Sequence, residues 1–279
     1  MALSPLVSTD WLAENLGLPN IVPIDASWHM PDTNRSGAKE FQQALIPDAV
    51  FFDIDLIADT STNLPHTMPS PDAFAARVQN LGISNEDTLI VYNKGDIPTA
   101  ARAWWMFRAM GHSNVYMLDG GYKKWCDENK PITTDIVPRP ISTFKAVQDS
   151  SLVKYTSDLL KTLGSSNEQI IDARSSGRFN GTVAEPRAGL RSGHIPGSKN
   201  IPFTNLYNRD GTLKNNSELI KIIEAAGITL MAPIITSCGS GVTACNLAIA
   251  FAALGKWDVA VYDGSWTEWG SNISLPIEP

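Results

Sequence analysis

Residues 89–125, LIVYNKGDIPTAARAWWMFRAMGHSNVYMLDGGYKKW, align without a gap with residues 233–269, PIITSCGSGVTACNLAIAFAALGKWDVAVYDGSWTEW. Eleven of the 37 aligned positions are identical, at a constant offset of 144 residues. Agreement at one spacing indicates an internal duplication, and this spacing is too long for the repeat of a solenoid. The chain is therefore predicted to contain two copies of one domain.

Two shorter blocks upstream repeat in the same order. The stretch IVPIDAS (21–27) resembles QIIDARS (169–175), and ALIPDAVFFDID (44–55) resembles GHIPGSKNIPF (193–203). Because three blocks recur in one order, the duplication extends over most of each half of the chain.

A proline-rich segment separates the two copies. The stretch NKPITTDIVPRPIS (129–142) contains three prolines and little apolar periodicity, which is typical of a linker. We therefore predict an N-terminal, non-catalytic domain at residues 1–136 and a C-terminal, catalytic domain at residues 142–279.

Each copy alternates segments that favour strands with segments that favour helices. Runs such as TLIVYN and VYMLD are short, apolar and rich in β-branched or aromatic residues, as in strands covered on both faces of a parallel sheet. Helices are predicted at residues 71–81, 99–110 and 243–254, each followed by a glycine that can end a helix. The predicted fold class is α/β, with two tandem domains, each a small parallel sheet flanked by helices.

The composition excludes several classes of protein. The 279 residues are 43% hydrophobic and carry a net charge of −7, so we expect a folded core and no nucleic-acid partner. No run of about 18 apolar residues and no targeting segment is visible, so we expect no membrane partner and a cytoplasmic location. The three cysteines are too few for a disulfide framework and lack zinc-site spacing, so we expect free thiols and no metal.

Cys238 is the position at which the two copies differ most in chemistry. It aligns with Lys94, although both loops continue with a glycine and then with Thr-Ala at the start of a helix. The loop runs from a predicted strand into a predicted helix, and its two glycines would let the backbone curl with positive φ. The other two cysteines, Cys126 and Cys245, are interpreted as buried core thiols.

The loop that follows Cys238 is predicted to bind an anion. Its successive N–H groups would point inward at a helix N-terminus and favour the thiolate, which is the nucleophilic form of cysteine. The residues that supply these groups are Gly239, Ser240, Gly241, Val242 and Thr243.

Several cysteine chemistries do not fit this loop. A phosphatase of the Cys-x5-Arg type would need an arginine where Ala244 stands, and a Cys-x-x-Cys redox site would need a cysteine in place of Gly241. Nothing near Cys238 indicates a cysteine protease. Five amides around one sulfur suit a persulfide, because they would stabilise its terminal anion.

These motifs resemble the tandem-domain rhodanese family of sulfurtransferases over about residues 5–270. The resemblance is carried by WWMFRAMGH, LDGG, GRFNGT, EPRAG, SGHIPGSKNIPF, CGSGVTAC and YDGSWTEWG, in that order. Family members that prefer thiosulfate tend to carry Arg and Lys directly after the cysteine, where this chain has Gly239 and Ser240. The neutral loop resembles that of the members that use 3-mercaptopyruvate.

The resemblance also implies the roles of further residues. Arg178 in GRFNGT and Arg187 in EPRAG match the family's substrate arginines, and guanidinium groups suit the carboxylate of a 2-oxo acid. The alternative to substrate binding is that each arginine is a solvated charge on a loop or forms an ion pair, for example with Glu185. Ser240 would act in proton transfer with His66 and Asp55 of the first domain. The alternative for His66 is that it is an ordinary polar residue of a loop.

The resemblance implies that sulfur moves from 3-mercaptopyruvate through a persulfide on Cys238 to a thiophilic acceptor, with release of pyruvate. The acceptor would be cyanide, thioredoxin or another thiol, no cofactor would be needed, and the chain would act as a monomer. Two other hypotheses stay open. One is a thiosulfate sulfurtransferase, and the other is a non-catalytic module that binds a persulfide and regulates a partner.

Overall fold

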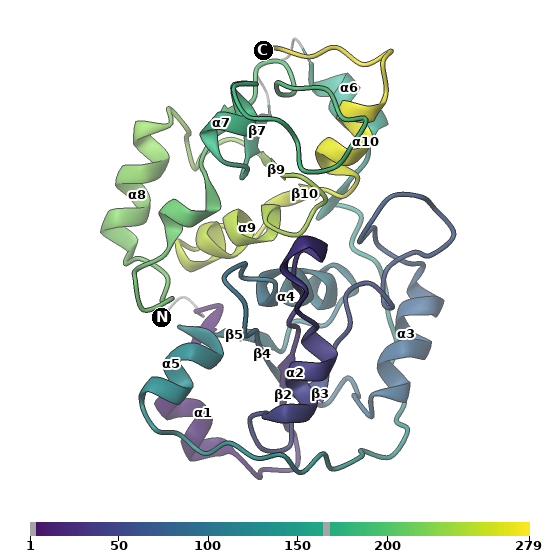
Figure 1. The fold of residues 1–279 in the computed structure, drawn as a ribbon, viewed down its shortest axis with the longest axis vertical. Coiled ribbons are helices and arrows are strands. Elements are labelled where there is room, and N and C mark those ends of the chain that lie inside the picture. The colour runs from purple at the N-terminus through teal and green to yellow at the C-terminus, as the bar shows by residue number, and fades with distance from the viewer. Residues whose placement is uncertain (1–3, 164–167) are drawn as a thin grey trace.

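The computed structural model describes residues 4–163 and 168–279, which form two α/β domains stacked along the long axis of the molecule (Figure 1). Each domain contains a five-stranded sheet, and the strand pairs of both sheets are parallel. The order β1-β5-β4-β2-β3 in the first sheet is repeated as β6-β10-β9-β7-β8 in the second. The predicted fold class and the duplication are therefore confirmed.

The ten strands are short, as the brief apolar runs of the sequence predict. The strands of the first sheet are β1 (Leu6–Val7), β2 (Ile21–Asp25), β3 (Val50–Phe51), β4 (Thr88–Tyr92) and β5 (Val115–Leu118). Those of the second are β6 (Val153–Lys154), β7 (Gln169–Asp172), β8 (Lys199–Asn200), β9 (Ile234–Ser237) and β10 (Ala260–Tyr262).

The helices cover both sheets and also form the contact between the domains (Figure 1). Those of the first domain are α1 (Thr9–Asn15), α2 (Gly37–Gln43), α3 (Pro71–Asn80), α4 (Ala100–Ala109) and α5 (Gly121–Asp127). Those of the second are α6 (Thr156–Thr162), α7 (Ser176–Phe179), α8 (Asn216–Ala225), α9 (Ala244–Ala253) and α10 (Ser265–Ser271). Two short 3₁₀ helices lie at Pro31–Thr33 and Phe203–Leu206.

Helices α4 and α9 pack against each other between the two sheets. Both are alanine-rich, and nearly all of their residues are buried, because each helix has its own sheet on one side and the other domain on the other. They begin one residue later than the sequence predicted, since Thr99 and Thr243 occupy the N-cap positions. The strand ends that precede these helices therefore face the domain interface.

The segment between the domains stays attached to the first domain beyond the predicted linker. The Ser142 N–H donates to the Gln79 carbonyl at 3.2 Å, and the Phe144 ring packs 6.0 Å from Phe74. Further along, the Asp149 N–H donates to the Ala109 carbonyl at 2.7 Å. The predicted start of the second domain at residue 142 thus falls inside a segment that packs on the first domain.

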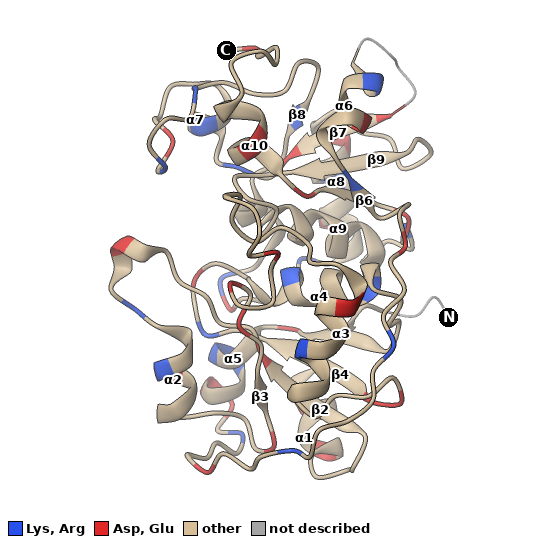
Figure 2. Cartoon of the chain, turned by 90° about the vertical axis from the view of Figure 1, so that its right-hand side faces the viewer, with Lys and Arg blue, Asp and Glu red and all other residues tan. Residues whose placement is uncertain are grey.

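Charged residues are scattered over the molecule. Figure 2 shows Lys and Arg interspersed with Asp and Glu over both domains, with no broad basic face in that view. In the part of the chain that the structure describes, every helix is too short or too polar to cross a bilayer.

Candidate active site

The Cys238 loop connects β9 to α9 at the carboxyl edge of the second sheet, the edge at which parallel α/β sheets bind ligands. Cys238 itself is only 1% exposed. Among the described residues, no oxygen or nitrogen accepts a hydrogen bond from the backbone N–H groups of residues 239–243. Five buried or half-buried donors are thus left for an anion, as the nest prediction requires.

Helix α10 orients these donors. The Trp266 N–H donates to the Cys238 carbonyl at 2.9 Å, and the Thr267 N–H donates to the Gly239 carbonyl at 2.8 Å. In a trans peptide the C=O and the following N–H point in opposite directions. Because these carbonyls face α10, the N–H groups of Gly239 and Ser240 point away from it.

The two glycines of the loop serve different purposes. Gly241 has a φ of 76°, as the sequence predicted, but Gly239 does not have a positive φ, so that prediction is wrong for Gly239. A Cβ at Gly239 would lie 3.0 Å from Nη2 of Arg178 and 3.9 Å from Nη1 of Arg187. A side chain at this position would crowd the Arg178 guanidinium but not that of Arg187, so Gly239 lets Arg178 lie close to the loop.

The loop opens into a cavity of about 160 Å³ between the domains. Arg178 and Arg187 line it from the second domain, and Trp28 and Ile97 line it from the first. The remaining lining residues are Met30, Arg174, Ser175, Pro186, Phe203, Cys238, Gly239, Ser240, Val242 and Thr243. A ligand in this cavity would contact both domains.

The structure brings His66, Asp55 and Ser240 together. His66 Nδ1 lies 3.1 Å from Ser240 Oγ, and His66 Nε2 lies 2.9 Å from Asp55 Oδ1. Since the carboxylate accepts from Nε2–H, Nδ1 is the nitrogen free to accept the serine O–H. Burial alone would raise the pKa of Asp55, but hydrogen bonds from His66 and Trp28 outweigh it and hold that pKa below its usual value.

Trp28 belongs to this arrangement and was missed in the sequence. Its Nε1–H donates to Asp55 Oδ2 at 2.9 Å, and its ring meets the His66 ring edge-on at 4.9 Å. Trp28 lies shortly after β2, at the carboxyl edge of the first sheet. That position was the available signal, because ligand sites gather at this edge.

The two arginines have different surroundings. Arg178 donates through Nε to Glu185 Oε1 at 3.1 Å and also pairs with Glu185 through Nη2. The ion pair named as the alternative is therefore present, and the substrate role of Arg178 stays a prediction. Glu185 is in turn held by Arg174 at 2.7 Å. Arg187 has no ion pair or hydrogen bond among the described residues, and its burial lowers its pKa. It is the guanidinium that lacks a partner in the cavity.

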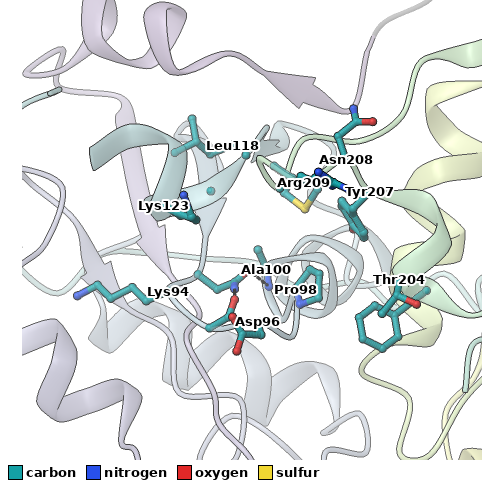
Figure 3. A pocket seen from close by; sticks show the side chains of 17 residues that line it. Lys94, Asp96, Pro98, Ala100, Leu118, Lys123, Thr204, Tyr207, Asn208 and Arg209 are labelled. Atoms are coloured by element: carbon teal, nitrogen blue, oxygen red, sulfur yellow. Dashed lines mark hydrogen bonds between the residues drawn. The ribbon is translucent and has the colours of Figure 1, made fainter. Parts of the chain in front are cut away.

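Lys94, the counterpart of Cys238, occupies the equivalent place in the first domain. Its Nζ donates to the Glu40 and Ala44 carbonyls and lies 3.5 Å from Asp25 Oδ2. A larger cavity of about 370 Å³ lies beside it, and there the Lys94 side chain points away from Arg209 (Figure 3). Lys94 therefore fills a polar pocket within its own domain.

Cys245 lies inside α9, away from the cavity. Its Sγ contacts the Gly241 carbonyl at 3.2 Å, and burial raises the pKa of this thiol to about 12. A thiol with that pKa stays protonated near neutral pH and is a poor nucleophile. No group of three or more His, Cys, Asp or Glu residues within residues 4–163 and 168–279 is arranged to hold a metal ion.

Comparison with known proteins places this geometry in a family. The model of the rhodanese-like domain matches residues 8–128 and again residues 156–272. The 3-mercaptopyruvate sulfurtransferase of Escherichia coli is 42% identical over 280 residues, covering 100% of this chain and 99% of the relative. A thiosulfate sulfurtransferase of Rattus norvegicus is 44% identical over 271 residues, covering 95% and 91% of the two chains.

A solved structure agrees along almost the whole chain. The crystal structure of SseA from Escherichia coli has a TM-score of 0.87 and 40% identity, and the match covers 95% of this chain and 99% of that one. The family resemblance seen in the sequence is thereby confirmed for both halves. This chain belongs to the rhodanese family, with two rhodanese-like domains in tandem.

Proposed function

We propose that this protein is a 3-mercaptopyruvate sulfurtransferase, which moves sulfur through a persulfide on Cys238 to a thiophilic acceptor and releases pyruvate. One observation carries the proposal: Cys238, Ser240 and Arg187 line one cavity, and Ser240 is connected to His66 and Asp55 of the first domain. A nucleophile, a carboxylate-binding group and a proton donor are what this reaction needs.

Substrate binding is assigned to the two arginines. The carboxylate of a 2-oxo acid can accept two parallel hydrogen bonds from the guanidinium of Arg187, which no described residue engages in a hydrogen bond or ion pair. Arg178 lies beside Gly239, but Glu185 holds it in place. In this proposal Arg178 adds positive charge near the substrate, and Arg187 makes the direct contact.

The first half-reaction forms the persulfide. The Cys238 thiolate attacks the sulfur of 3-mercaptopyruvate, an S–S bond forms, and the C–S bond breaks. The electron pair of that bond passes to the carbon fragment, which leaves as the enolate of pyruvate. The S–H proton of the substrate passes through the Ser240 hydroxyl to Nδ1 of His66, whose Nε2–H is held by Asp55. His66 then returns this proton through Ser240 to the methylene carbon of the enolate, which completes pyruvate and leaves the persulfide as an anion.

The second half-reaction discharges the persulfide. The N–H groups of residues 239–243 stabilise the terminal sulfur anion until an acceptor attacks that sulfur and Cys238 leaves as thiolate. Cyanide, thioredoxin or another small thiol would serve as acceptor. The persulfide itself carries the sulfur, so these steps invoke no metal or organic cofactor. A monomeric state and a cytoplasmic location stay predictions.

The sulfur donor is the point at which the proposal can be tested. Thiosulfate is a compact dianion, and the positions after Cys238 that could bind it with basic side chains are neutral, Gly239 and Ser240. Steady-state assays with both donors should give a kcat/KM at least about tenfold higher for 3-mercaptopyruvate, a difference of roughly 1.4 kcal/mol. A preference for thiosulfate would replace this proposal with the alternative donor.

A regulatory module that only binds a persulfide is the alternative from another class. It would gain the mass of one sulfur atom on incubation with the donor but would not turn over. The contact between His66 and Ser240 across the domain interface favours an enzyme, because a carrier of sulfur has no need of a proton relay.

Arg187→Lys should raise KM for 3-mercaptopyruvate by about 10- to 100-fold, with a smaller change in kcat. Lysine keeps the charge but loses the two-pronged hydrogen bond to the carboxylate, and hydrogen bonds to charged groups contribute about 1.5–3 kcal/mol. Arg191→Lys is the matched control, since Arg191 caps backbone carbonyls of α10, such as that of Trp269, and does not line the cavity. An unchanged KM in Arg187→Lys would remove Arg187 from the substrate site.

A further inference from the structure

One buried guanidinium touches the catalytic segments of both domains. Arg102, on α4, is fully buried, and its Nη2 donates to the His66 carbonyl and to Asp263 Oδ1, the latter at 2.9 Å. Its Nη1 donates to the Gly241 carbonyl at 3.3 Å. The same group thus contacts the backbone of the histidine from the first domain and of the Cys238 loop from the second.

Asp263, which follows β10, completes the connection. Its Oδ2 accepts the Met68 N–H at 2.7 Å, two residues beyond His66, while its Oδ1 accepts from Arg102. The Trp105 ring lies 4.6 Å from the guanidinium carbon of Arg102 and limits its movement on one face. The segment at residues 66–68 is therefore held through a carbonyl by Arg102 and through an N–H by Asp263.

Both backbone segments held by Arg102 are in the left-handed conformation. His66 has a φ of 63° and Gly241 a φ of 76°. A left-handed φ is unfavourable for histidine and persists only where its surroundings enforce it. The contacts with Arg102 and Asp263 supply that enforcement, and this conformation directs Nδ1 of His66 toward Ser240.

The internal duplication provides a comparison within the same molecule. Asp119 aligns with Asp263 and likewise accepts a backbone N–H from the other domain, that of Leu213, at 2.8 Å. Arg102, however, aligns with Asn246, whose Nδ2 reaches only the Pro98 carbonyl across the interface, at 3.2 Å. An aspartate is thus present on both sides of the interface, whereas the arginine is present only on the side that faces Cys238.

We propose that Arg102 is a positioning residue for sulfur transfer, which holds His66 in register with Ser240 across the domain interface. The inference rests on the proposed function. It assigns to the first domain a part in the reaction beyond His66 and Asp55. Arg102 would act mainly on the protonation of the enolate, through His66. Its bond to the Gly241 carbonyl orients only the Val242 N–H, one of the five that face the persulfide, so discharge of the persulfide, a step that forms no enolate, would change little.

Arg108 offers a matched control on the same helix. It too lies at the domain interface but is only half-buried, and its guanidinium stacks on Trp257 of the second domain at 4.5 Å. It lies away from the Cys238 cavity. Arg108→Lys therefore reports the effect of loosening the interface without disturbing His66.

The experiment measures the two half-reactions separately in Arg102→Lys and Arg108→Lys. Release of pyruvate from 3-mercaptopyruvate should slow by about 10- to 100-fold in Arg102→Lys, since a misplaced acid–base group loses part of its contribution. Discharge of the completed persulfide by cyanide should stay within about twofold of the unchanged protein, as should both steps in Arg108→Lys. Equal slowing of both steps in Arg102→Lys would overturn the proposal.

Combining Arg102→Lys with Ser240→Ala distinguishes a role in positioning His66 from a general role in stability. If Arg102 acts through the serine and histidine, then adding Arg102→Lys to Ser240→Ala should slow pyruvate release by less than about twofold, because residues of one unit are not additive. An undiminished further loss would contradict the proposal. If Arg102→Lys melts before assay, Asp263→Asn takes its place with the same expected results. Failure of the unchanged protein to release pyruvate would refute the proposed function instead.

Discussion

Replacing Cys238 by serine is expected to abolish sulfur transfer, lowering kcat/KM by about 10⁶-fold or more. A serine hydroxyl stays protonated near neutral pH and cannot carry sulfur as a persulfide, so both half-reactions lose their nucleophile. The fold should persist, because serine has a similar volume and the N–H of residue 238 keeps its hydrogen bond to Ser265 Oγ at 3.2 Å. Pyruvate release and a thermal melting curve check the two parts of this prediction.

Cys126→Ser is the control for that experiment. Cys126 lies on α5 in the first domain, is partly exposed and does not line the cavity. Its replacement should leave the rate of pyruvate release unchanged. Substantial activity in Cys238→Ser, with or without an effect of Cys126→Ser, would show that the persulfide mechanism assigned to Cys238 is wrong.

His66→Asn is expected to lower kcat by about 10² to 10⁴, the usual contribution of a positioned acid–base group. Asparagine is chosen because it tolerates the left-handed conformation of this position better than alanine does. Its shorter side chain cannot reach Ser240 and Asp55 together, so the enolate would lose its proton donor. KM should change little, since His66 makes no contact with the substrate carboxylate in the proposed binding mode.

The control for His66 is another buried histidine of the first domain. His112 packs beside Phe107 and Phe144, and among the described residues it forms no hydrogen bond with Ser240 or Asp55. His112→Gln should retain kcat even if it lowers the melting temperature. Full activity in His66→Asn would assign His66 to the alternative reading, an ordinary polar residue of the loop.

The fold could be predicted from the sequence because the same order of strand and helix patterns occurs in both halves of the chain. Runs such as TLIVYN predict strands, and the alanine-rich stretches before Gly111 and Gly255 predict helices, without knowledge of the tertiary contacts. Helices α4 and α9 begin within one residue of the predicted positions. The Cys238 loop could be interpreted for the same reason, since strand, loop and helix are adjacent in the chain. The φ of Gly239 could not be predicted, because this glycine leaves room for Arg178 rather than providing a left-handed turn.

Contacts between the domains lay beyond what the residues alone could predict. His66 and Ser240 are 174 residues apart, and only the family resemblance suggested their pairing. Arg102 gave a weak signal, a charged residue inside a helix whose neighbours are apolar, and its partner Asp263 is 161 residues away. For Trp28 the sequence offered only its place after a predicted strand, and its contact with Asp55, 27 residues further along the chain, could not be predicted.

The structure also explains why the first domain is retained although Lys94 replaces its nucleophile. That domain provides Trp28 at the cavity, His66 and Asp55 in contact with Ser240 and each other, and Arg102 bound to the His66 carbonyl. Its own loop carries Lys94 in place of a thiol, and the Lys94 ammonium lies beside Asp25 within the first domain. The second domain thus supplies the Cys238 thiol and Ser240, and the first domain supplies His66 and Asp55.

The central claim is that Cys238 takes sulfur directly from 3-mercaptopyruvate. A single-turnover experiment without acceptor tests it most directly, with pyruvate measured and the chain analysed by peptide mass spectrometry. The account predicts one pyruvate per chain and a mass increase of one sulfur atom on the peptide that contains Cys238. Pyruvate released without that increase, or an increase found on Cys126 or Cys245 instead, would contradict it.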